Sequence, residues 1–472
     1  MTPPPELWRA SAAEIADAVR ASVVSASEVV AAHLARIHEV NPLVGALTTV
    51  FDDRARDRAR RIDARLARGE DPGPLAGVPF SVKENIDLAW SATTHGWRGA
   101  RAAVPADDAT VVARMLAAGA IPLGRGNMPD FGMRWETEND LFGRTRNPWS
   151  AAHSPGGSSG GDAVAVATGM VAVGLGNDYG GSLRVPANAV GVTGFRPTGG
   201  RLASSTAHRT EPVPLSIQQF STAGILTRHV GDTDLVFGIV HGADGRDPFA
   251  VTRPHPRGYD GPRRAAILRD PFGDGESDEN AAALDAAAES LGRAGWELVE
   301  GHPPRLDEAV TGWRLLSTTE MQNAYEPSRW DPPLGRGAGR FLELAGGAQT
   351  HLDTVEEYAA VWARRAVVAA AWQDFVREHP VLIGAVSETR PPLADADLAD
   401  AETAGSWWRR YRLSVAVNYL ALPAIAVPTG RAADGLPTGV QAISDAGADH
   451  VAFAAARDIE AACGVQTPVT PR

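Results

Sequence analysis

The sequence has 472 residues, with 45 basic and 57 acidic side chains and a formal net charge of −12. This acidic balance argues against binding to nucleic acid or to an anionic membrane surface. A single cysteine, Cys463, excludes an internal disulfide, and no Cys/His cluster has the spacing of a structural zinc site. Apolar and charged fractions of 44% and 22% are typical of a globular protein with an ample core.

The first elements in the chain are predicted to be helices followed by a buried strand. Serine and glutamate three residues apart form capping boxes, and apolar residues then follow helical spacing. The predicted elements are helices that begin at Ser11-Glu14 and Ser25-Glu28, an arginine-rich helix over 52–68, a buried strand over 77–83, a helix over 110–118 and a strand over 121–123.

The central part alternates glycine-rich turns with apolar segments. The predicted elements are a long loop over 143–161, a helix over 162–170, a strand over 171–175 and a glycine-rich turn over 174–182. Strands that alternate with helices in this way indicate an α/β layered fold.

Segments rich in proline and glycine at 243–263 and 387–400 mark boundaries in the last part of the chain. The predicted elements here are strands over 265–268 and 296–300, helices over 278–294 and 354–377, buried strands over 425–427 and 440–443, and a final helix that ends near Cys463. The uncharged run 413–430 contains two prolines, so it predicts two buried elements and no membrane span. Residues 1–20 have no apolar stretch typical of a signal peptide, and we expect a reduced, cytoplasmic location.

The basic residues divide very unevenly, because 44 are arginine and the remaining one is Lys83. Arginine stays charged in proteins, whereas a buried lysine can lose its proton. Lys83 is therefore a candidate for a neutral amine, although chance alone can also leave one lysine in an arginine-rich chain.

Two clusters of glycine and serine, at 156–161 and 176–182, are the other candidates for chemistry. Glycines let backbone N–H groups approach a ligand closely, and serine adds a nucleophile. A phosphate-binding loop would need lysine beside Ser or Thr, and a Ser-x-x-Lys pattern would need serine where Phe80 stands. The Gly-x-Ser-x-Gly match at 156–160 has no strand before it, and no dinucleotide-binding pattern opens a helix. With these patterns set aside, the candidate chemistry that remains is a serine nucleophile activated by a neutral lysine.

Several segments along the chain resemble the amidase signature hydrolases, which use a Ser–cisSer–Lys triad. The match is loosest over 245–410. The matching segments are 77–86, 124–131, 146–149 with 154–161, 178–187, 422–425 and 435–441.

The resemblance implies a role for each matched residue. Lys83 corresponds to the general base, Ser158 to the bridging serine whose peptide bond is cis in this family, and Ser182 to the nucleophile that becomes acylated. Further implied roles are an oxyanion hole of backbone N–H groups from Tyr179, Gly180, Gly181 and Ser182, and support of the loops by Asp178, Arg184 and Ser159.

Some positions depart from the family pattern. Asn177 stands where threonine is frequent, and Ala421 where glycine is usual. Arg125 and Arg196 occupy positions that are often lysine in relatives, whereas Lys83 is retained. None of these departures removes a member of the triad.

The resemblance implies an α/β fold of the amidase-signature type, with a large mixed sheet flanked by helices on both sides. We expect one domain over 1–472, with a variable, substrate-shaping region at about 245–410. The expected function is hydrolysis of a carboxylic amide, with esters and carbamates as further candidates, and without a cofactor or metal. The expected partner is a small-molecule amide, with neither nucleic acid nor membrane, and a homodimer is one candidate assembly. Tryptophans in the variable region are expected to be mostly core, with one or two lining an apolar acyl pocket.

Three alternatives stay open. A transamidase subunit of the same family would work with partner chains, and Val185, where such subunits usually have glutamine, argues against it. An α/β-hydrolase esterase would depend on a histidine. A binding protein with an inactive site would have lost part of the triad, which is intact here.

Overall fold

The computed structural model describes residues 6–204, 212–326, 330–346 and 351–471. Its strands are β1 Leu47–Val50, β2 Pro79–Lys83, β3 Ile121–Gly126, β4 Glu138–Asn139, β5 Gly143–Arg144, β6 Val173–Asp178, β7 Thr193–Arg196, β8 Thr222–Thr227, β9 Arg264–Leu268, β10 Glu297–Glu300, β11 Val381–Ala385, β12 Ala424–Arg431 and β13 Pro437–Ile443.

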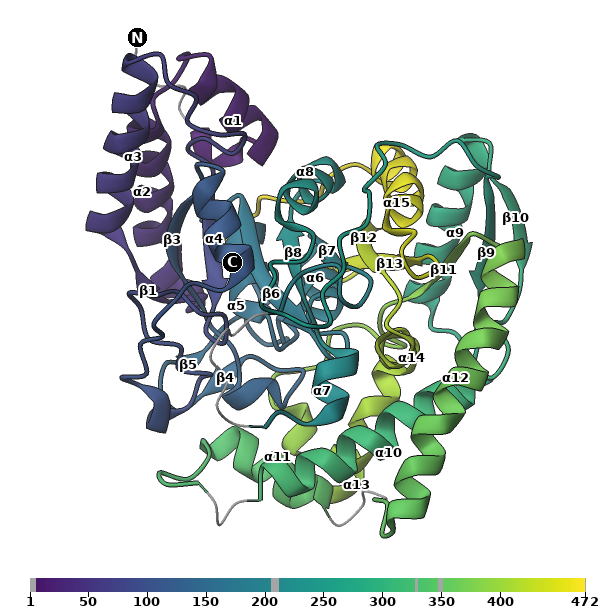
Figure 1. Ribbon diagram of the computed structural model, residues 1–472. Coiled ribbons are helices and arrows are strands. Elements are labelled where there is room, and N and C mark those ends of the chain that lie inside the picture. The colour runs from purple at the N-terminus through teal and green to yellow at the C-terminus, as the bar shows by residue number, and fades with distance from the viewer. Residues whose placement is uncertain (1–5, 205–211, 327–329, 347–350, 472) are drawn as a thin grey trace.

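The α-helices lie between and around these strands (Figure 1). They are α1 Ala12–Arg20, α2 Ala26–Val44, α3 Asp52–Ala67, α4 Thr110–Ala117, α5 Gly160–Ala167, α6 Arg184–Val190, α7 Leu215–Phe220, α8 Val230–Val240, α9 Asp278–Arg293, α10 Leu306–Ala324, α11 Arg336–Gly346, α12 Val355–Glu378, α13 Ala401–Ser406, α14 Arg412–Leu420 and α15 Asp449–Cys463.

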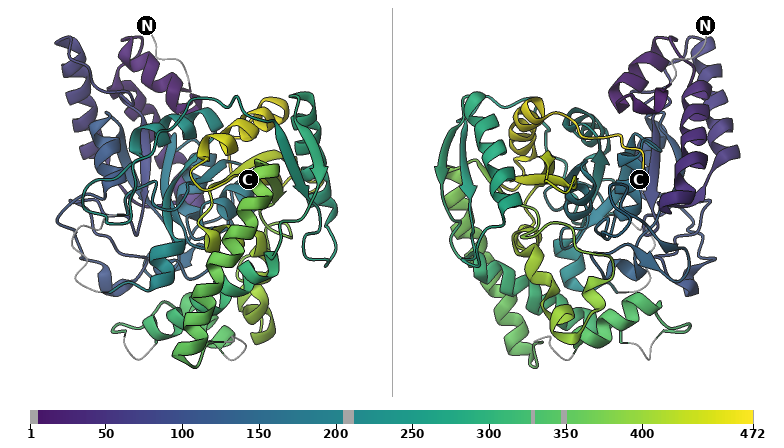
Figure 2. Two further views of the ribbon diagram at one scale, coloured as in Figure 1. Left: turned by 45° about the vertical axis from the view of Figure 1, so that its right-hand side comes forward. Right: turned by 180° about the vertical axis from the view of Figure 1, so that it is seen from behind.

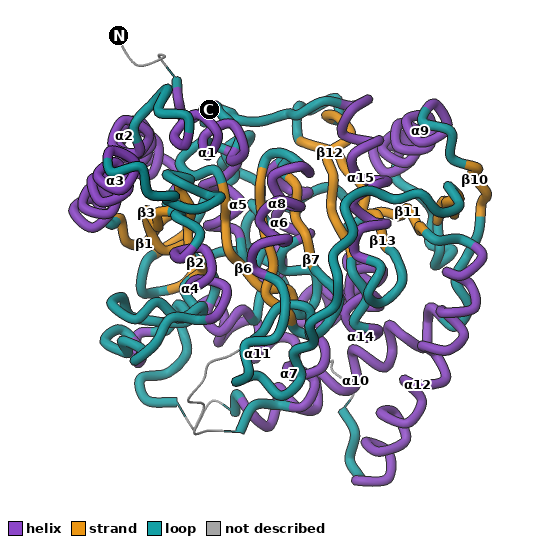
Figure 3. Tube along the Cα trace, turned by 45° about the horizontal axis from the view of Figure 1, so that its top comes forward, coloured by secondary structure: helices purple, strands orange, loops and turns teal. Residues whose placement is uncertain are grey.

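One mixed sheet organises the molecule. Within the described residues it has eleven strands in the order β1-β3-β2-β6-β8-β7-β12-β13-β11-β9-β10. Strand β2 is parallel to both β3 and β6, and β9 is parallel to β10 and β11, while the other neighbouring pairs are antiparallel. The strands cross the middle of the molecule with helices on both sides, so the predicted α/β fold with a large mixed sheet is confirmed (Figure 3).

The helix starts predicted from capping boxes are confirmed. At Ser11, Ser25 and Thr354 the side chain accepts the N–H of a glutamate three residues on, and that glutamate accepts the N–H of the cap residue. Each box satisfies backbone donors that a helix start leaves unpaired. The sequence alone was sufficient to predict these helix starts, because the two residues of each box are only three positions apart.

The glycine-rich turn predicted over 174–182 is wrong in its first half, because β6 continues through Asp178. Gly174 and Gly176 sit in this strand where other segments approach closely. A Cβ at Gly174 would lie 3.0 Å from Asp162 Cβ, and one at Gly176 would lie 2.7 Å from Ser159 Oγ. These glycines therefore make room for packing against α5 and do not mark a turn.

The variable region contributes more than loops. It supplies β9, β10 and β11 at one edge of the sheet, and the unpredicted helices α10 and α11. Helix α10 begins after Arg305 without a side-chain cap, so it lacks the signal that marked other helices. In Figure 2 these teal to green elements lie along the side and the bottom of the molecule, away from the purple N-terminal helices at the top.

The core is formed by two groups of buried apolar side chains. The larger group spans the sheet and the helices on it, from α1 to α15. The smaller lies among α10, α12 and α14, close to β9 and β11. No helix in the described part of the chain is long and apolar enough to cross a membrane.

Candidate active site

Lys83 lies at the end of β2 and is fully buried. Its Nζ is 2.8 Å from each of three oxygens, Ser158 Oγ, Ser159 Oγ and Asn177 Oδ1. Strand β2 is parallel to β6, so the ends of both strands, which carry Lys83 and Asn177, meet at one edge of the sheet. The structure thus brings together Lys83 and Ser158, the residues that the resemblance paired as general base and bridging serine.

Burial strongly shifts the pKa of this amine. Desolvation lowers the pKa of Lys83 well below its ordinary value, and the Asp162 and Asp178 carboxylates oppose that shift. Asp162, on α5, is equally buried, and desolvation raises the pKa of its carboxyl while the Ser81 hydroxyl donates to it at 2.6 Å. Each of these two buried groups therefore favours the charged form of the other.

Ser158 and Ser159 directly precede α5. The peptide bond between Gly157 and Ser158 is cis, as the resemblance implied. Gly157 is required here, because a Cβ would lie 2.7 Å from the carbonyl oxygen of Glu136. Ser159 was expected only to support the loop, but its hydroxyl contacts Lys83 directly and also donates to the Asn177 carbonyl at 3.3 Å.

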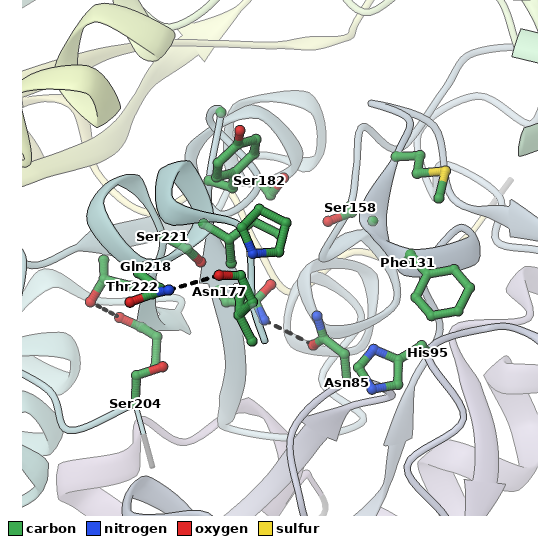
Figure 4. Close-up of a pocket in the computed structure, with 18 of the residues that line it drawn as sticks. Asn85, His95, Phe131, Ser158, Asn177, Ser182, Ser204, Gln218, Ser221 and Thr222 are labelled. Atoms are coloured by element: carbon green, nitrogen blue, oxygen red, sulfur yellow. Dashed lines mark hydrogen bonds between the residues drawn. The ribbon is translucent and has the colours of Figure 1, made fainter. Parts of the chain in front are cut away.

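Ser182 lies between β6 and α6. The Ser159 N–H donates to the Ser182 carbonyl at 3.1 Å, which ties the segments of the two serines together. Ser158 and Ser182 both line one cavity with Asn85 and Asn177 (Figure 4). Among the described residues the Ser182 hydroxyl has no hydrogen-bond partner.

The Asp178 carboxylate organises the turn before Ser182. It accepts the N–H groups of Gly181 at 2.8 Å and Leu183 at 3.2 Å, and the Arg184 guanidinium at 3.0 Å. Both Asp178 and Arg184 are fully buried. Burial alone would raise the pKa of Asp178, but Arg184, Arg196 and the Asn418 amide together outweigh it and hold that pKa well below its usual range.

One of the four expected oxyanion donors is already used within the turn. The Gly181 N–H is already donated to Asp178. The N–H groups of Tyr179, Gly180 and Ser182 have no acceptor within the described residues.

Sequence reasoning missed three polar residues of the site. Asn177 was noted only as a departure from the family, Asn85 was not singled out, and Asp162 was placed at a helix start without a role. The Asn177 side chain bridges Lys83 and Asn85, because its Nδ2 donates to Asn85 Oδ1 at 2.9 Å. Its position directly before Asp178 was the available signal.

The cavity has a volume of about 1160 Å³ and reaches from the serines to the variable region. Six of the tryptophans in the variable region were expected to be mostly core, with one or two at the pocket wall; three of the six line the cavity and three pack in the core. The first set is Trp313, Trp330 and Trp408, and the second is Trp362, Trp372 and Trp407. No group of three or more His, Cys, Asp or Glu side chains suited to a metal ion occurs in the described ranges.

Comparison with known proteins identifies the family. The amidase family model matches residues 28–452. The chain is 33% identical to the indoleacetamide hydrolase of Bradyrhizobium diazoefficiens, over 97% of this chain and 87% of that protein. It is also 33% identical to a glutamyl-tRNA(Gln) amidotransferase subunit from Anaeromyxobacter dehalogenans, over 98% of each chain. The solved structure of 6-aminohexanoate cyclic dimer hydrolase superposes with a TM-score of 0.82 at 26% identity, covering 97% of this chain and 98% of the other. With a family model that spans almost the whole chain and relatives of this similarity, the protein belongs to the amidase (amidase signature) family.

Proposed function

We propose that the protein hydrolyses a carboxylic amide through an acyl-enzyme on Ser182, with Lys83 as general base acting through Ser158. The observation that carries this proposal is the contact between the buried Lys83 amine and the Ser158 hydroxyl at 2.8 Å. A hydroxyl becomes an effective nucleophile only when a neighbouring base takes its proton, and burial keeps a lysine amine neutral.

The hydrogen-bond partners of Lys83 support this direction of proton transfer. A neutral amine has two N–H donors and one lone pair. Asn177 Oδ1 can only accept, and the Ser159 hydroxyl donates its own hydrogen to the Asn177 carbonyl, so both oxygens accept a hydrogen bond from a Lys83 N–H group. The lone pair is left for Ser158, whose hydroxyl then donates to Lys83.

In the proposed reaction, Ser182 Oγ attacks the amide carbonyl while its proton passes to Ser158 Oγ and the Ser158 proton passes to Lys83 Nζ. The N–H groups of Tyr179, Gly180 and Ser182 stabilise the oxyanion. Gly181 was also expected to donate to the oxyanion, but its N–H already donates to the Asp178 carboxylate, so it is left out. The proton returns through Ser158 to the leaving nitrogen, and the C–N bond breaks. Water then attacks the acyl-enzyme by the same route and releases the carboxylic acid and Ser182.

We further propose that the variable region at 245–410 shapes the acyl pocket and that the acyl group is aromatic. Rings from both halves of the chain line the cavity, among them Phe131, Trp313, Tyr325 and Trp330. Phe131 and Trp330 lie 4.6 Å apart between ring centroids, and Tyr325 and Trp330 are stacked at 5.6 Å. Aromatic walls favour flat apolar ligands, and one relative is an indoleacetamide hydrolase.

A substrate panel tests this function against the transamidase alternative, which is supported by relatives that are amidotransferase subunits. The purified chain, without partner proteins, is incubated with indole-3-acetamide, phenylacetamide, aliphatic amides and L-glutamine, and ammonia is measured. We expect release from the aromatic amides and little from glutamine. Release from glutamine alone, and only after partner proteins are added, would favour the transamidase.

The pH dependence offers a test of Lys83 as base. Because the neutral amine is the active form, kcat/KM rises with pH through the pKa of Lys83. The Asp162 carboxylate favours the protonated amine, so Asp162→Asn is expected to lower the Lys83 pKa further. The acid limb of the kcat/KM profile then moves to lower pH. Asp434→Asn, a change on the surface away from the cavity, serves as the matched control and should leave the limb in place. A limb that moves to higher pH in the Asp162 variant contradicts the assignment.

A further inference from the structure

Two tryptophans hold consecutive carbonyl groups of the segment that precedes Ser182. Trp313 Nε1 donates to the Tyr179 carbonyl at 3.0 Å, and Trp135 Nε1 donates to the Gly180 carbonyl at 2.8 Å. Trp313 lies on α10 in the variable region, whereas Trp135 follows the short helix at 130–132. The indole N–H is a donor only, so its one hydrogen bond is fully committed to this segment.

Fixing these carbonyls also fixes N–H directions. In a trans peptide the C=O and N–H groups point to opposite sides of the C–N bond. Holding the Tyr179 carbonyl therefore sets the direction of the Gly180 N–H, away from Trp313. Holding the Gly180 carbonyl sets the direction of the Gly181 N–H, which donates to Asp178 Oδ1 at 2.8 Å. Of these two N–H groups, the Gly181 N–H is therefore occupied, whereas the Gly180 N–H has no acceptor among the described residues.

The two indoles are themselves well anchored. Trp135 stacks on Tyr411 at 4.9 Å between centroids, and Trp313, 6% exposed, lies 5.6 Å from the Tyr179 ring. Gly180 fits closely between them, because a Cβ there would lie 2.8 Å from Trp313 Cζ2. A donated hydrogen bond at a carbonyl also polarises its peptide and strengthens the N–H on the other side.

We propose that Trp313 and Trp135 are positioning residues: Trp313 holds the Tyr179–Gly180 peptide and Trp135 the Gly180–Gly181 peptide, so that the Gly180 N–H between the two anchored carbonyls faces the developing oxyanion. This role rests on the proposed function of Ser182. Both indoles also line the cavity, so the residues that would contact the substrate are the same ones that orient the oxyanion donor.

The test is Trp313→Phe, which retains an aromatic wall but removes the N–H donor. We expect kcat on the best amide of the panel to fall about 3- to 10-fold, the range for one lost neutral hydrogen bond, with KM nearly unchanged. Trp135→Phe should act in the same direction. Trp372→Phe is the matched control, because its indole is buried in the same core, does not line the cavity and has no partner among the described residues. That variant should keep the wild-type kcat.

A transition-state readout separates positioning from packing. An aryl trifluoromethyl ketone forms a tetrahedral oxyanion adduct with a serine, so its affinity should fall by the same factor as kcat in Trp313→Phe. A wild-type kcat, or a change confined to KM, would overturn the proposal and leave the indoles as wall residues only. Failure of the proposed function is distinguishable, since the wild-type protein would then neither turn over amides nor form the ketone adduct.

Discussion

Replacement of Ser182 by alanine is expected to lower kcat for amide hydrolysis at least about 10⁴-fold, as for other serine nucleophiles. The reason is that, in the proposed reaction, Ser182 Oγ is the atom that forms the acyl-enzyme, and alanine has no hydroxyl to replace it. The Ser158 hydroxyl contacts Lys83 Nζ, and the backbone at Gly157 beside it packs tightly against Glu136, which leaves Ser158 little room to take the place of Ser182. The fold should remain intact, because the Ser182 hydroxyl has no hydrogen-bond partner among the described residues.

Covalent labelling gives the same prediction a direct readout. Phenylmethylsulfonyl fluoride should modify the wild-type protein at Ser182, found by mass spectrometry of the peptide that contains it, and should leave Ser182→Ala unmodified. Ser290→Ala, a buried serine on α9 away from the cavity, is the control and should be labelled like the wild type. Labelling at Ser158, with activity retained in Ser182→Ala, would support the alternative nucleophile in the Gly-x-Ser-x-Gly pattern.

Replacement of Lys83 by arginine is expected to lower kcat about 10²- to 10⁴-fold, the usual contribution of a general base. Arginine keeps a positive charge but does not lose its proton in proteins, so it cannot accept one from Ser158. The rate of labelling of Ser182 by the sulfonyl fluoride should fall as well, because the hydroxyl is no longer activated.

Arginine is larger than lysine, and Lys83 is fully buried, so a second variant guards against misfolding. Lys83→Met keeps the length of the side chain without an amine and should be equally inactive. Arg228→Lys, the reverse exchange at another buried position far from the cavity, should retain activity within a few-fold. Circular dichroism and the thermal midpoint check the fold of each variant. Substantial turnover by a folded Lys83→Arg protein would rule out Lys83 as the base.

Local sequence signals predicted those parts of the fold in which the interacting residues are neighbours in the chain. The capping boxes at Ser11, Ser25 and Thr354 are examples, and so is the apolar run that ends at Lys83. Helix α10 was missed because it begins without such a cap. The turn expected at Gly174 was wrong because glycine there serves close packing against α5, which no local pattern reveals.

In the segment 177–182, too, the residue types were visible in the sequence but their contacts were not. Its glycines and Asp178 were visible as a motif, but the Gly181 N–H is taken by Asp178 and is not available as expected. Asn177 looked like a departure from the family pattern and proved to contact Lys83. Trp135 and Trp313 lie 45 and 134 positions from the carbonyls that they hold, so neither contact has a signal in the sequence.

The sequence by itself determined the α/β class, the resemblance to the amidases, and the retention of one lysine among 45 basic residues. The α/β class follows from periodicity along the chain, the lysine count from composition, and the resemblance from matched motifs. Only the tertiary structure decided what surrounds that lysine, because Ser158, Ser159 and Asn177 converge on it from two other segments. Burial by those segments lowers the pKa of Lys83, and this property depends on distances that exist only in the folded chain.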